Sequence, residues 1–335
     1  MHNTERPKST QRNDMFAKPR LLGLSPVALL GWAILAIVPL FVKNTYVIYL
    51  MTFSLLLGSQ AMAFDFSVGF INIVNFGFAG FVGLGAYTSG LLATKLGISP
   101  WISMWAGALA GGLLGLLIGA LTLRLRGLYA AVMAWFATLT LMAVTTAWVS
   151  LTRGNYGLSV VSLFKSVDIQ PYYYTLLPIS FGIYVLLHGI TRSHIGLAFR
   201  AIGQNLGAAQ ASGVDPARYK IINFMVSCAC AGLLGAFHAH WVGTITPSLM
   251  NSPHTIEVLA LAYIGGRGSI WGGLVAALMI IPTFENLRSL LEMRLIIYGA
   301  LLILVMIFYP SGLAGIFRQI GHLVTRLRKG TTEKE

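Results

Sequence analysis

Three ionisable residues, Asp65, Glu257 and Arg267, lie within otherwise apolar stretches and are the best candidates for chemistry. Placing a charge in hydrocarbon costs about 2.5–3.5 kcal/mol on insertion scales, so such residues usually face a cavity or a partner. Asp65 and Glu257 each begin a stretch that we expect to be irregular, and Arg267 lies in a glycine-rich break. The ends of broken helices and their exposed backbone amides can meet the carboxylate and the amine of a zwitterion.

We therefore predict that these residues line a translocation path for a small polar solute. The full set is Asp65, Asn72, Asn75, Glu257, Gly265, Gly266, Arg267 and Gly268. The alternative is that Asp65 lies at the headgroup boundary and that the Arg267 side chain extends to the same boundary.

Patterns typical of an enzyme are missing from the sequence. The chain has no G-x-x-x-x-G-K-[ST], so it cannot bind a nucleotide through a P-loop. His238 and His240 are two residues apart, as are Cys228 and Cys230, so the members of each pair face apart on a helix. We expect a chain that is not an enzyme and holds no cofactor or metal of its own.

The elements that position these residues are long apolar runs. Hydrophobic residues make up 56% of the 335 positions and charged residues only 10%, against about 25% charged in soluble domains. About 20 apolar residues cross a bilayer as a helix. The runs are 24–42, 46–64, 101–123, 128–149, 173–190, 221–242 and 295–309. This pattern predicts an all-α, polytopic transmembrane bundle of about 8–10 spans.

Two stretches are too interrupted to be ordinary spans. The first, 65–80, contains three glycines and two asparagines. The second consists of two short apolar pieces, 257–264 and 270–281, separated by GGRGS. A single crossing of the second stretch would place the basic C-terminal tail outside, so we expect a re-entrant or broken element there.

The net charge of +13 follows membrane topology and does not indicate nucleic-acid binding. Sixteen basic residues fall in four clusters that the positive-inside rule places in the cytoplasm, against six on the other side. We predict a bacterial inner-membrane protein with both termini in the cytoplasm. Its parts are a tail (1–20), a transmembrane domain (21–316) with an inner loop (191–220), and a second basic tail (317–335).

The inner loop is predicted to contain a short helix that lies across the cytoplasmic face. Asn205 is suited to cap its start and Gly213 to end it in a left-handed conformation. Asp215 and Pro216 then begin the next helix. Ala208 and Ala209 give the short helix a surface that another protein can approach closely. An ordinary interhelical loop is the alternative, and local chemistry does not separate the two.

A stripe of four glycines recurs every four residues in the run 101–123. Its members are Gly107, Gly111, Gly115 and Gly119. Small residues at this spacing allow helix backbones to approach closely. We favour packing within the bundle over an interface between subunits.

Several segments together resemble LivM-type permeases, which are subunits of the ABC importers for branched-chain amino acids. The segments are RAIGQNLGAAQASGVDPARYK (200–220), LRLRGLYAAVMAWFATLT (123–140), GLGAY (83–87), LAYIGGRGSIWGGLVAA (261–277) and YPSGLAGI (309–316). The resemblance covers nearly all of the chain after the N-terminal tail.

The resemblance implies a permease subunit without an energy source of its own. Its expected partners are a second homologous permease, two cytoplasmic ABC ATPases that bind ATP and Mg, a periplasmic solute-binding protein and membrane lipid. The inner loop would be the coupling element that contacts an ATPase, through Arg200, Asn205, Ala208, Ala209 and Gly213. Urea or short amides are alternative solutes, and a passive channel or an ion-driven transporter is an alternative mechanism.

Overall fold

A computed structural model of the chain describes residues 26–42, 44–122, 128–165, 168–285, 299–300, 303–304, 307 and 312–315. Both predicted tails, the basic pair at 124 and 126 and most of the run 295–309 lie outside these residues. The α-helices are α1 (Pro26–Phe41), α2 (Thr45–Ile71), α3 (Phe78–Lys95), α4 (Pro100–Thr122), α5 (Leu128–Ala147), α6 (Val149–Thr152), α7 (Gln170–Arg192), α8 (His194–Gln204), α9 (Leu206–Ala211), α10 (Pro216–Val242), α11 (Ser252–Gly265) and α12 (Trp271–Glu285). Short pieces connect them: the 3₁₀ helices η2 (Gly154–Tyr156) and η3 (Pro247–Met250), and the strands β1 (Leu158–Ser159) and β2 (Thr244–Ile245).

Five of the described helices, α2, α4, α5, α7 and α10, are long and apolar enough to cross a membrane. Helices α1 and α12 are apolar but shorter. Backbone polar groups in lipid must be satisfied within their own segment, which is why such runs fold as helices. The all-α membrane bundle that the sequence predicts is confirmed.

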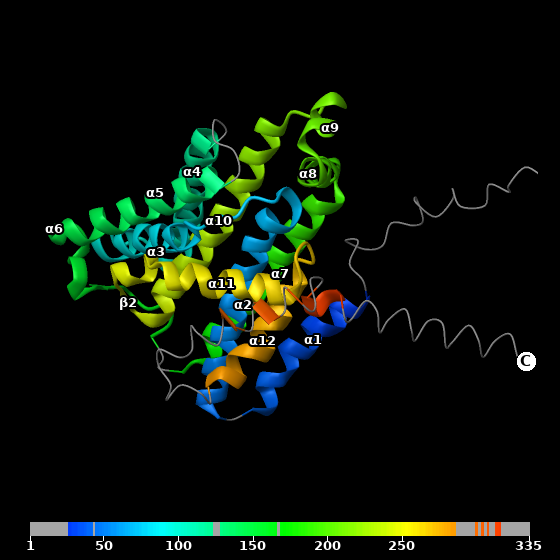
Figure 1. Cartoon of the computed structure of the whole chain (residues 1–335). Helices are drawn as coiled ribbons and strands as arrows, with labels where there is room; N and C mark the ends of the chain where they lie inside the picture. The colour runs from blue at the N-terminus through cyan, green and yellow to red at the C-terminus, as the bar shows by residue number, and fades with distance from the viewer. Residues whose placement is uncertain are drawn as a thin grey trace, which may run out of the picture.

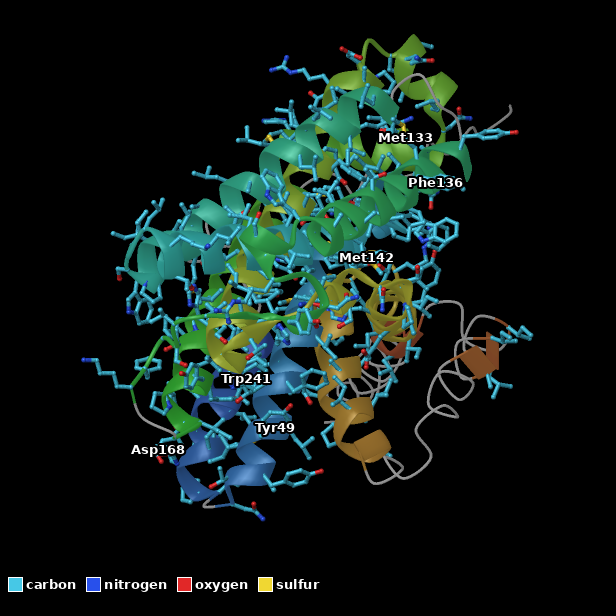
Figure 2. The ribbon with its side chains drawn as sticks, turned by 90° about the vertical axis from the view of Figure 1, so that its left-hand side faces the viewer. Tyr49, Met133, Phe136, Met142, Asp168 and Trp241 are labelled. Carbon is cyan, nitrogen blue, oxygen red and sulfur yellow. The ribbon has the colours of Figure 1, made fainter. Side chains whose placement is uncertain are left out.

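Helices α2 and α10 form the centre of the bundle (Figure 1). Of their most apolar windows, 78% and 67% of the residues are buried, against 17% for α5. Helix α5 lies at the edge of the bundle, and Figure 2 labels Met133, Phe136 and Met142 along it. The Phe136 side chain is 57% exposed. The centre therefore packs protein against protein, and α5 presents an apolar surface to its surroundings.

The glycine stripe of α4 packs within the bundle, as we expected, and its partner there is α10, which the sequence did not indicate. A β-carbon added to Gly111 would lie 2.5 Å from the backbone oxygen of Cys228. One added to Gly232 on α10 would lie 2.5 Å from the backbone oxygen of Gly107. The two backbones are close enough that only glycine fits at these two positions. The stripe is therefore covered by α10 within the bundle.

The end of the bundle opposite α8 and α9 is closed by a loop that includes β1. Strand β1 pairs with β2 in an antiparallel arrangement, which the sequence analysis did not predict. The Val161 carbonyl lies 2.7 Å from His240 Nδ1, which must therefore donate. His240 Nε2 then accepts, and it lies 2.8 Å from the Ser89 hydroxyl. Nearby, the rings of Tyr49 and Trp241 lie 5.3 Å apart (Figure 2).

The expectation that Asp65 and Glu257 begin irregular stretches is wrong. Helix α2 continues through Asp65 to Ile71, and only residues 72–77 are irregular. Asp65 stays helical because its carboxylate finds partners elsewhere in the bundle and its apolar neighbours remain buried. Glu257 lies inside α11, and the break follows Gly265. The predicted broken element is present, and α11 and α12 pack against each other.

Candidate functional site

The buried carboxylate of Asp65 holds the break between α11 and α12. Its Oδ1 accepts a hydrogen bond from the Gly268 backbone N–H at 2.9 Å, and its Oδ2 accepts one from the Ile270 N–H at 3.0 Å. Asp65 is only 1% exposed. A helix start leaves backbone N–H groups without partners. The Ser269 hydroxyl accepts from the Gly272 N–H in the first turn of α12. The Asp65 carboxylate satisfies the N–H groups just before that helix, and it locks the break to the middle of the bundle.

The backbone of the break is strained. Gly266 and Gly268 have φ values of 105° and 75°, which glycine adopts easily, but Ile270 has φ 52°. A β-branched residue in the left-handed region is unusual and costs roughly 1–2 kcal/mol. The hydrogen bond from Ile270 to Asp65 and the near-complete burial of Ile270 maintain this conformation.

Gly69 allows the break to approach α2. A β-carbon at this position would overlap the backbone nitrogen of Gly268. Residue 69 therefore has to be glycine for Asp65, one turn earlier on α2, to reach the break. The sequence analysis noted Gly69 only as an interruption, and its actual role is this close contact.

The Arg267 side chain reaches from the break to the C-terminal end of α2. Its Nη2 donates to the Val68 carbonyl at 3.3 Å and also to the Asn72 Oδ1. The guanidinium carbon lies 5.4 Å from the ring centre of Tyr263 on α11. A cation at a helix C-terminus is stabilised by the unsatisfied carbonyls there. Arg267 thus has defined partners on two helices.

Asn72 connects this group to α8. It ends α2 with φ 62°, a left-handed conformation that asparagine tolerates better than most residues. Its Oδ1 accepts from Arg267, and its Nδ2 donates to the Gly203 carbonyl at 3.0 Å. The two ends of one amide therefore contact the break and the last turn of α8.

Helix α8 is fixed against α2 by aromatic contacts and by a close backbone approach. The rings of Phe199 and Phe66 meet edge to face with their centres 5.6 Å apart. Arg200 lies over the Phe70 ring at 5.8 Å and donates to the Thr191 carbonyl at 3.2 Å. A β-carbon at Gly203 would overlap the Phe70 carbonyl oxygen. Movement of α8 along α2 is therefore sterically restricted.

Helix α9 forms as the local sequence predicts. The Asn205 Oδ1 accepts from the Ala208 N–H at 3.1 Å, and Gly213 adopts φ 82° after the helix. Asp215 caps α10 by accepting from the Ala217 N–H at 2.9 Å. Of the six residues of α9, only Ala209 is buried. Figure 1 shows α9 at the upper end of the molecule, next to α8 and beyond the ends of the long helices.

Two of the residues predicted to line the path lie apart from this group. Asn75 is buried in the turn before α3, where its Oδ1 accepts from the Gly77 N–H at 3.0 Å. Glu257 lies eight residues before the end of α11, about 12 Å along the helix at 1.5 Å per residue. The structure brings Asp65, Asn72, Gly266, Arg267 and Gly268 together, with Gly265 at the end of α11.

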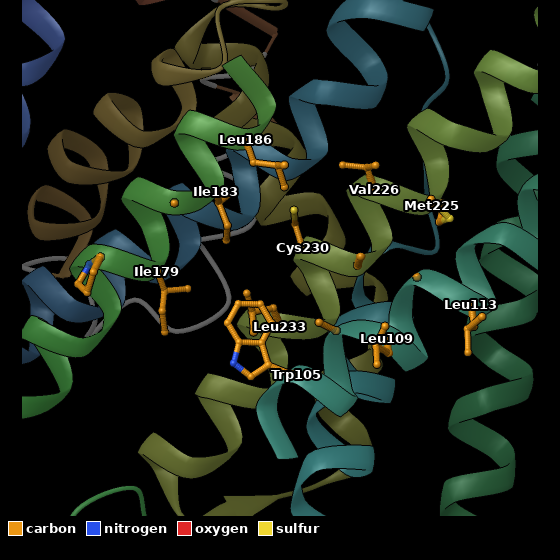
Figure 3. Close-up of a pocket in the computed structure, with 15 residues that line it drawn as sticks. Trp105, Leu109, Leu113, Ile179, Ile183, Leu186, Met225, Val226, Cys230 and Leu233 are labelled. Carbon is orange, nitrogen blue, oxygen red and sulfur yellow. The ribbon is translucent and has the colours of Figure 1, made fainter. Parts of the chain in front are cut away.

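An apolar groove of about 700 Å³ runs between α4, α7 and α10 (Figure 3). Trp105 and Leu109 of α4, Ile183 of α7 and Leu233 of α10 line it. None of the lining side chains carries a charge. The groove therefore has no group that could balance the charges of a zwitterion, and its lining suits an apolar ligand.

A second cavity, of about 280 Å³, lies at the end of α10 opposite α8 and α9. Two histidines and three hydroxyl groups contribute to its lining, together with Val242, Ile245 and Leu249. The polar residues are His238, His254, Thr244, Thr246 and Ser248. Unlike the groove, this cavity offers hydrogen-bond donors and acceptors to a polar solute.

The sequence was compared with known proteins. The family model of the branched-chain amino acid transport system / permease component matches residues 46–306. The high-affinity branched-chain amino acid transport system permease protein LivM is 25% identical in Salmonella typhimurium and 26% in Escherichia coli K12, over 280 residues. The LivH permease protein of Salmonella typhimurium is 28% identical over 183 residues, 50% of this chain and 59% of LivH.

The match to the two LivM proteins covers 75% of this chain and 66% of each relative, just under two thirds of their length. No solved structure matches the chain. The family model, by contrast, extends from the start of α2 past the end of α12, and so includes α8, α9, the break and Asp65. The chain therefore belongs to the family of branched-chain amino acid transport system permease components.

Proposed function

We propose that the chain is the transmembrane permease subunit of an ATP-driven ABC importer for branched-chain or related amino acids. It would form part of the translocation path in the bacterial inner membrane. ATP and Mg would bind to two separate cytoplasmic ATPases, and a periplasmic protein would deliver the solute. A second homologous permease would complete the path. The matches to both LivM and LivH, two permease proteins with the same system name, support such a pairing.

The observation that carries the proposal is the exposed helix α9. A helix of six residues is too short to be stable alone in water. Here it is capped at its start by Asn205, ended at Gly213 and anchored through α8, and Leu206, Ala208 and Ala211 remain exposed. A small, preformed and largely apolar surface of this kind suits a groove on a partner. Under the proposal that partner is an ATPase, and α8–α9 faces the cytoplasm.

The direct test is to purify the chain in mild detergent with the proteins that accompany it and to reconstitute the assembly in liposomes. We expect leucine uptake that requires ATP on the side of the vesicle membrane to which α9 is exposed. A channel would give flux without ATP, and uptake of urea in place of leucine would identify the alternative solute class. ATP-independent leucine flux would refute the importer.

A matched pair of substitutions tests the docking surface. Ala208→Arg places a long charged side chain on the exposed face of α9, whereas Ala147→Arg places the same side chain on exposed surface at the end of α5. We expect the first to release the ATPases during purification and to abolish uptake. The second should leave the assembly intact. Equal retention of the ATPases by both variants would contradict docking through α9.

A further inference from the structure

We propose that Asn72 is a positioning residue that transmits movement of α8–α9 to the break between α11 and α12. This inference rests on the proposed function and adds to it the route by which an ATPase would act on the membrane helices. The observation behind it is that a single side-chain amide bonds to both elements. Its Nδ2 donates to the Gly203 carbonyl, and its Oδ1 accepts from Arg267.

One bond of Asn72 ends on the backbone carbonyl of Gly203. The other comes from the Arg267 guanidinium, which is itself held by a backbone carbonyl of α2. Gly203 lies in the last turn of α8, two residues before Asn205, which caps α9. Arg267 lies inside the break and is also bonded to the Val68 carbonyl of α2. Displacement of α9 therefore has a path to the break through two side chains, those of Asn72 and Arg267, beside the packing of α8 on α2. Asparagine suits this position because it combines a donor and an acceptor with tolerance of the left-handed backbone.

The break has the properties of an element that can change conformation. Ile270 is held at positive φ by the hydrogen bonds from Gly268 and Ile270 to Asp65, together with bonds of Ser269 inside the break and local packing. Strain of this kind is retained where the surrounding structure enforces it, and it favours an alternative arrangement once a restraint is released. Arg267 lies between the strained residues and Asn72. Loss of the amide would remove this direct connection, so that a movement of α8 would displace the break less.

The test compares uptake and ATP hydrolysis in the same reconstituted importer, with radiolabelled leucine as the probe. Asn72→Gly removes the amide but keeps the left-handed backbone. Asn72→Asp keeps an acceptor for Arg267 but loses the donor to Gly203. We expect both variants to hydrolyse ATP while leucine taken up per ATP falls about tenfold, because both lose the hydrogen bond to the Gly203 carbonyl.

Asn223→Ala is the matched control. Asn223 also donates its amide to a carbonyl of α2, that of Phe66 at 2.8 Å, but it contacts neither α8 nor the break through that bond. We expect the Asn223→Ala variant to be less thermally stable than the unmodified protein. The amount of leucine that it takes up per ATP hydrolysed should stay normal. Arg267→Ala, which removes the donor at the other end of the connection, should reproduce the Asn72→Gly ratio. The double variant should be no worse than either single one.

The possible outcomes separate the two proposals. A normal ratio in Asn72→Gly, or the same loss in Asn223→Ala, would overturn the role of Asn72 and leave the importer intact. If Asn72→Gly does not fold, a normal ratio in Arg267→Ala overturns it equally. Absence of ATP-dependent uptake by the unmodified assembly would overturn both.

Discussion

Replacement of Asp65 by alanine should destabilise the protein strongly. The change removes both acceptors for the Gly268 and Ile270 N–H groups, at 2.9 and 3.0 Å, from a site that is 1% exposed. A hydrogen bond to a charged group contributes about 1.5–3 kcal/mol, so the loss of two amounts to about 3–6 kcal/mol. The Ile270 backbone also loses the bond that supports its left-handed conformation.

The assay is thermal unfolding of the purified protein in mild detergent, followed by tryptophan fluorescence. With about 2 °C of melting temperature per kcal/mol for a chain of this size, Asp65→Ala should lower the midpoint by about 6–12 °C. Asp215→Ala is the matched control, because Asp215 also accepts from a backbone N–H but at an exposed helix start. It should cost about 1 kcal/mol, or about 2 °C. Equal midpoints for the two variants would refute the assigned role of Asp65.

Three further predictions follow from close contacts and burial. Gly203→Ala should lower leucine uptake, because its β-carbon would overlap the Phe70 carbonyl and push α8 away from α2; an unchanged uptake rate would argue against this packing. Gly111→Ala should reduce the yield of monodisperse protein, since its β-carbon would lie 2.5 Å from the Cys228 oxygen, whereas Gly182→Ala, with no atom within 4 Å, should not. Cys228 is fully buried, so in a Cys230→Ala background a maleimide reagent should not label it until the protein is unfolded in SDS, and labelling of the native protein would disprove its burial.

The sequence was sufficient to predict those parts of the fold that depend only on residues close together in the chain. The caps at Asn205, Gly213 and Asp215 act within three residues of their own positions, so α9 and the start of α10 could be predicted from local chemistry. Helix lengths and the all-α class follow from the requirement to satisfy backbone groups in lipid. The broken element was predicted from its glycines.

The contacts of the site could not be predicted because they join distant residues. Asp65 and Gly268 are separated by 203 positions, and Asn72 and Gly203 by 131. In a soluble protein the polar face of a helix shows which side is buried. Here lipid and protein interior are both apolar, so the pattern along α2 does not show which residues face other helices. The type of residue at position 65 marked it as special, but not as the partner of a break.

The contact between α4 and α10 has a consequence for the synthesis and membrane insertion of the protein. Helix α4 ends at Thr122 and α10 begins at Pro216, so 93 residues separate the two. At about 5–20 residues per second, the ribosome needs roughly 5–19 s to make that interval and longer to finish α10. During this time the glycine stripe of α4 is in the bilayer without the helix that covers it. Synthesis of this permease thus includes a period in which an incomplete chain exposes to lipid the face of α4 that later packs on α10, and an insertase or holding factor would act in that interval.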